Sequence, residues 1–248
     1  MPARFRATLP CLLLLSTMVV SAQPGPAPTP RWADLLQPPV EVLQKACDDL
    51  AAAEKANPTP AHLKYTTAEL PPEGLVGQQL IDYRRTPGTF DTERVDDEIL
   101  IHLPAASVAT TCANAARLGQ TVNLKKYSFG PARSELSTTF YILSDAALVS
   151  DAMKYKASLR LLDASGQPLA VRQSAPYSRA ADPAQWQQHC DGNACRWYGF
   201  SVFRFNDLRL TPAIYAKLHT LQLVYDRGYG TETRTYVAAD FTRTTLND

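Results

Sequence analysis

Apolar residues recur with a helical period in the first part of the chain and with a period of two after residue 120. Between residues 40 and 56, Leu43, Cys47 and Leu50 follow one another at intervals of four and three, which places them on one face of a helix. Pro39 directly precedes this stretch and Asn57 directly follows it, as expected at helix boundaries. The pattern therefore predicts a helix over 40–56.

A second helix is predicted over 104–118, where Val108, Cys112 and Ala115 share one face and Gly119 supplies a stop signal. Just before it, the apolar run within 98–103 predicts a short buried strand. The proline-rich stretch 58–74 between the two helices is expected to be irregular.

After residue 120, alternating apolar and polar positions are typical of strands with one face in the core. Strands are predicted at 136–143, 155–161, 169–171, 196–205, 221–225 and 231–241. The aromatic stretch 196–205 has apolar residues on both faces, so we expect it to be central in its sheet. Residues 172–189 are predicted to form a long polar connection, and Thr211 is expected to cap a single helical turn that ends at Lys217.

Six or seven strands in about 125 residues can bury their apolar faces only by packing as two sheets. The sequence thus predicts a mainly β protein with a helical N-terminal part, in which an antiparallel immunoglobulin-like β-sandwich of six to seven strands accompanies two helices. The passage Leu210-Thr-Pro-Ala-Ile-Tyr215 resembles the corner before the sixth strand of fibronectin type III sandwiches, although its tyrosine comes one residue early. This resemblance implies sandwich topology and no function.

The N-terminus predicts export. Residues 1–22 combine Arg4 and Arg6 with an apolar stretch and the small residues Ser21 and Ala22, as signal peptides do. Residues 23–39 are proline-rich and are expected to form an extended tether. We expect 40–119 and 120–248 to form one compact unit outside the cytoplasm, either periplasmic or secreted, with no membrane insertion after signal cleavage.

Four cysteines remain once Cys11 is removed with the signal peptide, and an even number in an exported chain predicts two disulfides. The turn formers at 191–193 favour a bond between Cys190 and Cys195. Cys47 and Cys112 each lie on the apolar face of a predicted helix, which favours the second bond. A zinc site at His189-Cys190 would need a second ligand pair, so no metal is predicted.

The net charge and the absence of known catalytic motifs exclude several classes of function. The formal net charge is +1, from 25 basic and 24 acidic residues, which argues against a nucleic-acid binder that neutralises phosphates. No nucleophile elbow, zinc-protease motif or glycine-rich phosphate loop is present. No cofactor is predicted, and whether the protein is an enzyme stays open, with the balance against it.

The preferred hypothesis is a binding or accessory protein of the cell envelope or of the space outside the cell. Its partner, an unknown protein or glycan, would meet the sandwich loops at Trp186, Tyr177 and Arg179, next to the Cys190–Cys195 turn. Two alternatives remain. One is an extracytoplasmic hydrolase that uses the acidic cluster 91–98 with His102 or His189, and the other is a purely structural envelope component.

Overall fold

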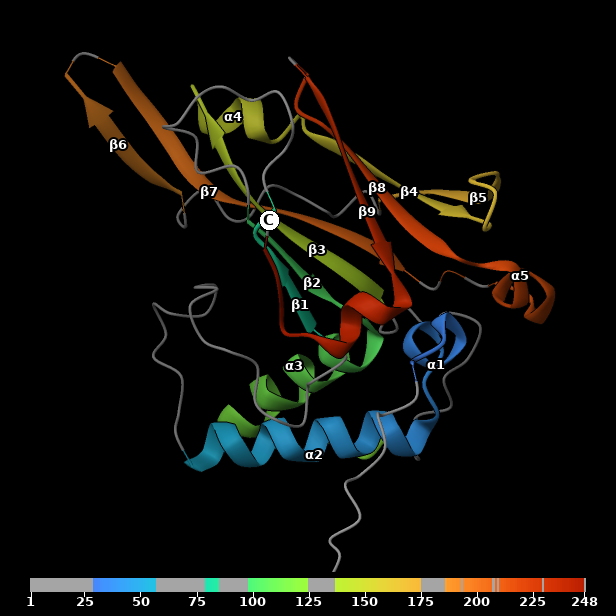
Figure 1. Cartoon of the computed structure of the whole chain (residues 1–248). Coiled ribbons are helices and arrows are strands. Elements are labelled where there is room, and N and C mark those ends of the chain that lie inside the picture. Colours follow the sequence, from blue (N-terminus) through green and yellow to red (C-terminus); the bar gives the residue numbers. More distant parts are fainter. Residues whose placement is uncertain are drawn as a thin grey trace, which may run out of the picture.

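The computed structural model describes residues 29–56, 79–84, 98–124, 137–174, 186–192, 194–206, 208, 210–228 and 230–247. The predicted signal peptide 1–22 and the start of the proline-rich segment lie outside these ranges. Two β-sheets and several helices make up the described part (Figure 1). The helices are α1 (Trp32–Leu36), α2 (Val40–Ala56), α3 (Pro104–Arg117), α4 (Val149–Ala152), α5 (Pro212–Lys217) and the 3₁₀-helix η4 (Ala238–Thr242).

The two sheets contain ten strands in the described residues. A six-stranded sheet has the order β10-β1-β2-β3-β7-β6, and a four-stranded sheet has the order β5-β4-β8-β9. The strands are β1 (Gln79–Asp82), β2 (Ile99–His102), β3 (Ser137–Ala146), β4 (Lys156–Leu162), β5 (Pro168–Gln173), β6 (Gln187–Asp191), β7 (Ala194–Asn206), β8 (Thr220–Asp226), β9 (Thr231–Val237) and β10 (Thr245–Leu246).

This topology confirms a mainly β, two-sheet protein with a helical N-terminal part, and it corrects the prediction in its details. All neighbouring strands are antiparallel except β1 and β10, which pair in parallel, so the sandwich is not purely antiparallel as the immunoglobulin-like prediction had it. The strand count exceeds six to seven because β1, β6 and β10 add to the predicted strands, and β6 forms within the predicted polar connection 172–189. The predicted last strand 231–241 ends at Val237 and continues as η4.

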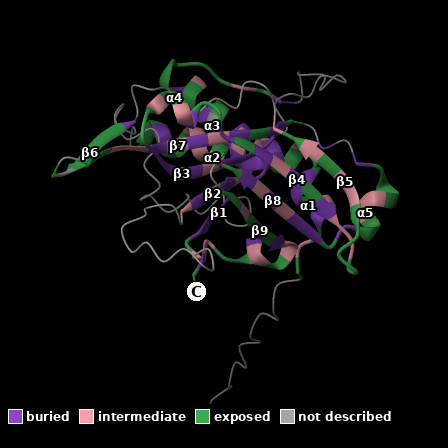
Figure 2. Cartoon of the chain, turned by 90° about the horizontal axis from the view of Figure 1, so that it is seen from above, coloured by how far each residue is buried: buried purple, intermediate pink, exposed green. Residues whose placement is uncertain are grey.

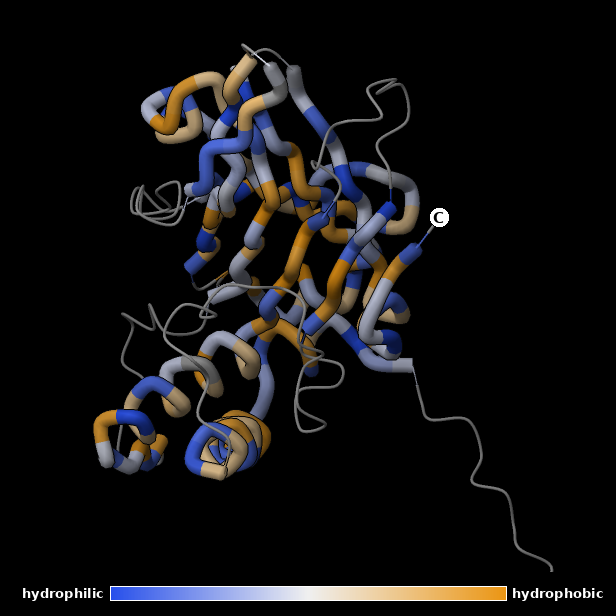
Figure 3. Tube along the Cα trace, turned by 90° about the vertical axis from the view of Figure 1, so that its left-hand side faces the viewer, coloured by the Kyte–Doolittle hydropathy of each residue, from blue (hydrophilic) through white to orange (hydrophobic). Residues whose placement is uncertain are grey.

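The inner faces of the two sheets pack together as one hydrophobic core (Figure 2). From the six-stranded sheet, Phe140 of β3 and Phe205 of β7 meet edge to face, with ring centroids 5.7 Å apart. Leu159 of β4 and Leu223 of β8 face them from the other sheet, and both are fully buried. Hydrophobic segments accordingly run through the centre of the molecule (Figure 3). Alternation along each strand places these side chains on one face.

The two predicted long helices pack against each other beside the sheets and form a second, smaller cluster (Figure 1). Leu43 and Cys47 of α2 and Val108 and Cys112 of α3 are buried in their contact, as the helical spacing predicts. A disulfide joins Cys47 to Cys112, with the Cα atoms 5.3 Å apart. This is the pairing that the sequence favours.

The proline-rich segment 23–39 was predicted to be extended, but residues 32–36 near its end form helix α1. Trp32, Leu35 and Leu36 are buried in the main core. The indole Nε1 of Trp32 donates a hydrogen bond to the backbone oxygen of His219 at 2.9 Å, and the Trp32 ring packs edge-on against Phe241. Large apolar side chains thus outweigh the extended preference of the surrounding prolines.

Candidate functional site

The structure places the sequence-predicted binding residues differently from the prediction. Trp186 was expected to lie exposed on a loop, but its side chain is only 4% exposed and belongs to the main core. Tyr177 and Arg179 lie outside the described residues, so their positions stay predictions. The expectation of an exposed ring at Trp186 is therefore wrong, and Trp186 cannot present its face to a ligand in this structure.

A glycine in the facing strand explains why Trp186 is buried. Trp186 precedes β6 and lies against Gly199 of β7, at a distance where a Cβ built on Gly199 would come within 2.6 Å of the indole ring. Only a residue without a side chain leaves room for the ring there. A glycine within an otherwise aromatic strand was the available sequence signal for this close approach.

Substituting Gly199 by alanine tests this packing. The added methyl group must displace the Trp186 ring, so we expect Gly199→Ala to lower the free energy of unfolding by about 1–3 kcal/mol in urea denaturation. The indole N–H resonance of Trp186 should also shift. Gly230→Ala is the matched control, because a Cβ there meets nothing within 4 Å. An equal effect of the two substitutions would contradict the packing described.

Beyond Trp186, β6 and the start of β7 form a hairpin that projects from the sandwich, as the two perpendicular views agree (Figures 1 and 2). Five residue pairs align the strands, from Gln187 with Tyr198 to Asp191 with Ala194. Gly192 turns the chain with a φ of 55°, a conformation that suits glycine. Gln187 to Cys190 are exposed, so β6 is a surface strand along its described length.

The tip of the hairpin is closed by the second disulfide. Cys190 and Cys195 lie directly opposite each other in the register, with Cα atoms 4.0 Å apart. Both residues are exposed, in contrast to the buried Cys47–Cys112 pair. The bond joins neighbouring strands and holds the outer end of β6 in a fixed register.

The sheets of the described part have four edge strands, and three of them carry features that discourage pairing with another chain. β10 has only two residues. β5 begins with Pro168 and its pairing to β4 shifts register at Leu162. In β9, Glu232 and Arg234 alternate with exposed threonines and point inwards. Short strands, prolines, irregular pairing and inward charges are the usual protections of a sheet edge.

The fourth edge, β6, shows none of these protections over Gln187–Cys190, whose side chains are all exposed. Its sequence Gln-Gln-His-Cys-Asp contains no proline and no lysine, and it pairs with β7 without a register shift. Among the described residues β7 is its only strand partner, so the other side of β6 offers backbone N–H and C=O groups. Such a regular, unprotected edge can accept a strand from another chain.

A buried charge cluster fixes the root of this hairpin to the opposite sheet. Asp145 at the end of β3 is 1% exposed and forms an ion pair with Arg196 of β7. From the β8–β9 turn, the Arg227 guanidinium lies 3.8 Å from the Asp145 carboxylate and also pairs with Glu232. Tyr155 donates a hydrogen bond to the backbone oxygen of Asp145 at 2.7 Å. Charges from both sheets therefore meet where the hairpin begins.

Of the residues proposed for a hydrolase, the structure describes Glu98, His102 and His189. Residues 91–97 of the acidic cluster lie outside the described ranges. Glu98 immediately precedes β2, which ends at His102, so the two residues are about 13 Å apart along the strand direction. His102 stacks edge-on against Tyr141, and burial lowers its pKa from 6.5 to about 4. His189 lies exposed on β6. In the described part of the chain, no group of three or more metal-binding side chains occurs.

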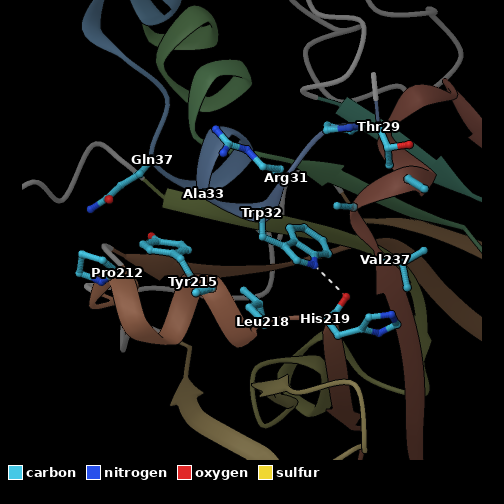
Figure 4. A pocket seen from close by; sticks show the side chains of 14 residues that line it. Thr29, Arg31, Trp32, Ala33, Gln37, Pro212, Tyr215, Leu218, His219 and Val237 are labelled. Atoms are coloured by element: carbon cyan, nitrogen blue, oxygen red, sulfur yellow. Dashed lines mark hydrogen bonds between the residues drawn. The ribbon is translucent and has the colours of Figure 1, made fainter. Parts of the chain in front are cut away.

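A cavity of about 800 Å³ lies between α1, α5 and the ends of β9 and η4 (Figure 4). Its lining is mostly apolar and includes Trp32, Tyr215 and Leu218. The Arg31 guanidinium at its rim is held by two hydrogen bonds to the Asp34 carboxylate, at 2.8 and 2.9 Å. The Trp32 indole N–H is likewise engaged within the chain. The cavity thus offers apolar contact, while these two polar groups serve to anchor α1.

Comparison of the chain with protein-family models, with curated proteins and with solved structures finds no match. Within the described ranges, no helix has both the length and the apolar character needed to cross a membrane.

Proposed function

We propose that this chain is an exported binding protein that engages a partner protein by accepting an extended segment of that partner along the free edge of β6. The observation that carries the proposal is the contrast between the edges: β6 is regular, exposed and unprotected, whereas β5, β9 and β10 are protected. Strand addition gives affinity through backbone hydrogen bonds and specificity through alternate side chains.

Three features support the hairpin as a preorganised surface. The Cys190–Cys195 bond fixes its tip, Trp186 packs its base onto Gly199, and the Asp145 cluster ties its root to both sheets. A strand held in one conformation before binding loses little conformational entropy when the partner adds to it. The buried Trp186 favours this mode over glycan stacking, which needs an exposed ring.

Export is the second half of the proposal. Two disulfides are compatible with an oxidising compartment, and the pattern of residues 1–22 predicts a signal peptide. We place the protein in the periplasm or outside the cell. Fractionation of cells that express the full chain, followed by N-terminal sequencing of the mature form, tests this: a chain recovered in the cytoplasm with residues 1–22 attached would contradict it.

Edge variants test the binding mode. The partner is first captured from the cell envelope with the mature protein, cross-linked and identified, and its affinity for the purified protein is then measured. We expect Gln188→Lys/His189→Lys on β6 to weaken binding at least about tenfold, because lysines along an edge oppose strand addition. The amides of β6 should also gain protection from hydrogen exchange in the complex.

The matched control uses the protected edge β5, where Val171 is 49% exposed. Val171→Lys/Gln173→Lys adds the same charge to the other sheet and is expected to leave the affinity unchanged. Equal binding by the β6 variant and the original protein would overturn the proposal, as would protection confined to other strands. A partner that proves to be a glycan would likewise overturn it.

A further inference from the structure

The two disulfides of this chain lie in opposite surroundings. Cys47 and Cys112 are each 2% exposed between two packed helices, and the bond joins positions 65 residues apart. Cys190 and Cys195 are exposed on a projecting hairpin and are separated by only five positions. Thiol–disulfide exchange requires an incoming thiolate to reach a sulfur atom, so access separates the two bonds chemically.

The fold depends on the two bonds to different degrees. Cys47–Cys112 closes a long loop and joins α2 to α3, whereas a bond across five positions restricts the unfolded chain much less. The β6–β7 hairpin also has other supports, since its register, the Gly192 turn and the packing of Trp186 on Gly199 do not require the sulfur bond. The hairpin bond can therefore open while the sandwich stays folded.

We infer that Cys190–Cys195 is a thiol–disulfide exchange site whose substrate is a dithiol, either a small molecule or a protein with two neighbouring cysteines. One donor thiolate attacks Sγ of Cys190 or Cys195, the S–S bond breaks, and the other cysteine leaves as a thiolate that takes up a proton. The second donor thiol, once deprotonated, attacks the donor sulfur of the mixed disulfide and releases the remaining cysteine. Two electrons pass from the donor, which becomes a disulfide, to the hairpin.

The exchange has a structural consequence for β6. In the oxidised form, the outer end of the strand is held by a covalent bond at Cys190. After reduction, only the backbone ladder and the turn at Gly192 hold it, so the outer amides should open more often. The reaction itself requires no partner strand and stands independently of the strand-addition proposal.

The test is differential reduction of the native, folded protein. Samples are exposed to dithiothreitol, quenched with acid, alkylated and mapped by peptide mass spectrometry. We expect Cys190 and Cys195 to be labelled at least about 100-fold faster than Cys47 and Cys112, because the buried pair is reached only in rare openings. Oxidised dithiothreitol should restore the hairpin bond, and hydrogen exchange in β3 and β8 should be unchanged throughout.

Two variants sharpen the test. Cys47→Ala/Cys112→Ala should keep the fast rate, and Cys195→Ser should form a stable mixed disulfide with oxidised glutathione at Cys190. Equal reduction rates for both native bonds would overturn the inference. So would a hairpin bond that does not re-form, or a loss of protection in β3 and β8 when only Cys190 and Cys195 are reduced.

Discussion

Replacing Arg227 by methionine is expected to lower the free energy of unfolding by about 3–5 kcal/mol. The Arg227 side chain is 3% exposed and contributes positive charge to both Asp145 and Glu232. Methionine keeps much of the volume but leaves the buried Asp145 carboxylate and the partly buried Glu232 carboxylate without that charge. Breaking a buried ion pair from one side is costly because the remaining charge cannot return to water. Urea denaturation at neutral pH measures the loss.

Arg196 provides the comparison, because it pairs with the same carboxylate while its side chain is 41% exposed. We expect Arg196→Met to lower the free energy of unfolding by about 1 kcal/mol, since water reaches the Arg196 guanidinium and Arg227 still lies beside the Asp145 carboxylate. Adding Glu232→Gln to Arg227→Met should restore part of the free energy of unfolding that Arg227→Met removes, because the Glu232 carboxylate that lost its partner is then replaced by a neutral amide. Similar losses for the two single arginine variants would contradict the burial of the cluster.

Lowering the pH from 6.5 to 4 is expected to remove about 3 kcal/mol of stability through His102 alone. Burial lowers the pKa of this imidazole from 6.5 to about 4 in the folded state. Between pH 4 and 6.5 the imidazole is therefore protonated in the unfolded chain and neutral in the folded chain. Stability therefore falls as the pH drops through this range. Both ring nitrogens are buried and have no hydrogen-bond partner in the described part of the chain.

The neighbours of His102 explain why burial decides its pKa. Its cross-strand neighbours are the uncharged Gln79 of β1 and Thr139 of β3, and Tyr141 stacks against the ring. The measurement is the difference in unfolding free energy between the original protein and His102→Phe, taken as a function of pH so that other groups cancel. A direct NMR titration of the ring should give a midpoint near 4. A midpoint near 6.5 would contradict the prediction.

The sequence predicts what local periodicity encodes. The bounds of α2 follow from its apolar spacing and its flanking prolines, and α5 begins at Pro212 with Thr211 accepting a hydrogen bond from the Ile214 amide, as predicted. The disulfide pairing followed from the same logic, since two helix faces that bury cysteines must meet. The helix bounds depend on residues that are close in sequence, and the cysteine pairing depends on two helical faces that local spacing defines.

Features that depend on distant residues were not predictable in this way. The parallel pairing of β1 with β10 joins segments more than 160 positions apart, and two-residue strands carry no periodic signal. The burial of Trp186 depended on Gly199 in another strand. The cluster of Asp145, Arg196 and Arg227 is assembled from three separate elements, and each residue alone is typical of a solvated surface.

The packing of the β6–β7 hairpin on the core lies at its root, where Trp186 contacts Gly199. Neither hydrophobic cluster takes a side chain from residues 187–190, 192, 194 or 195. Mutations at the tip therefore leave the interior untouched, and new recognition sequences could be grafted there while the sandwich serves as an unchanged scaffold. Proteins that share this core can therefore diverge quickly in binding specificity through changes at the hairpin tip, while the core stays the same.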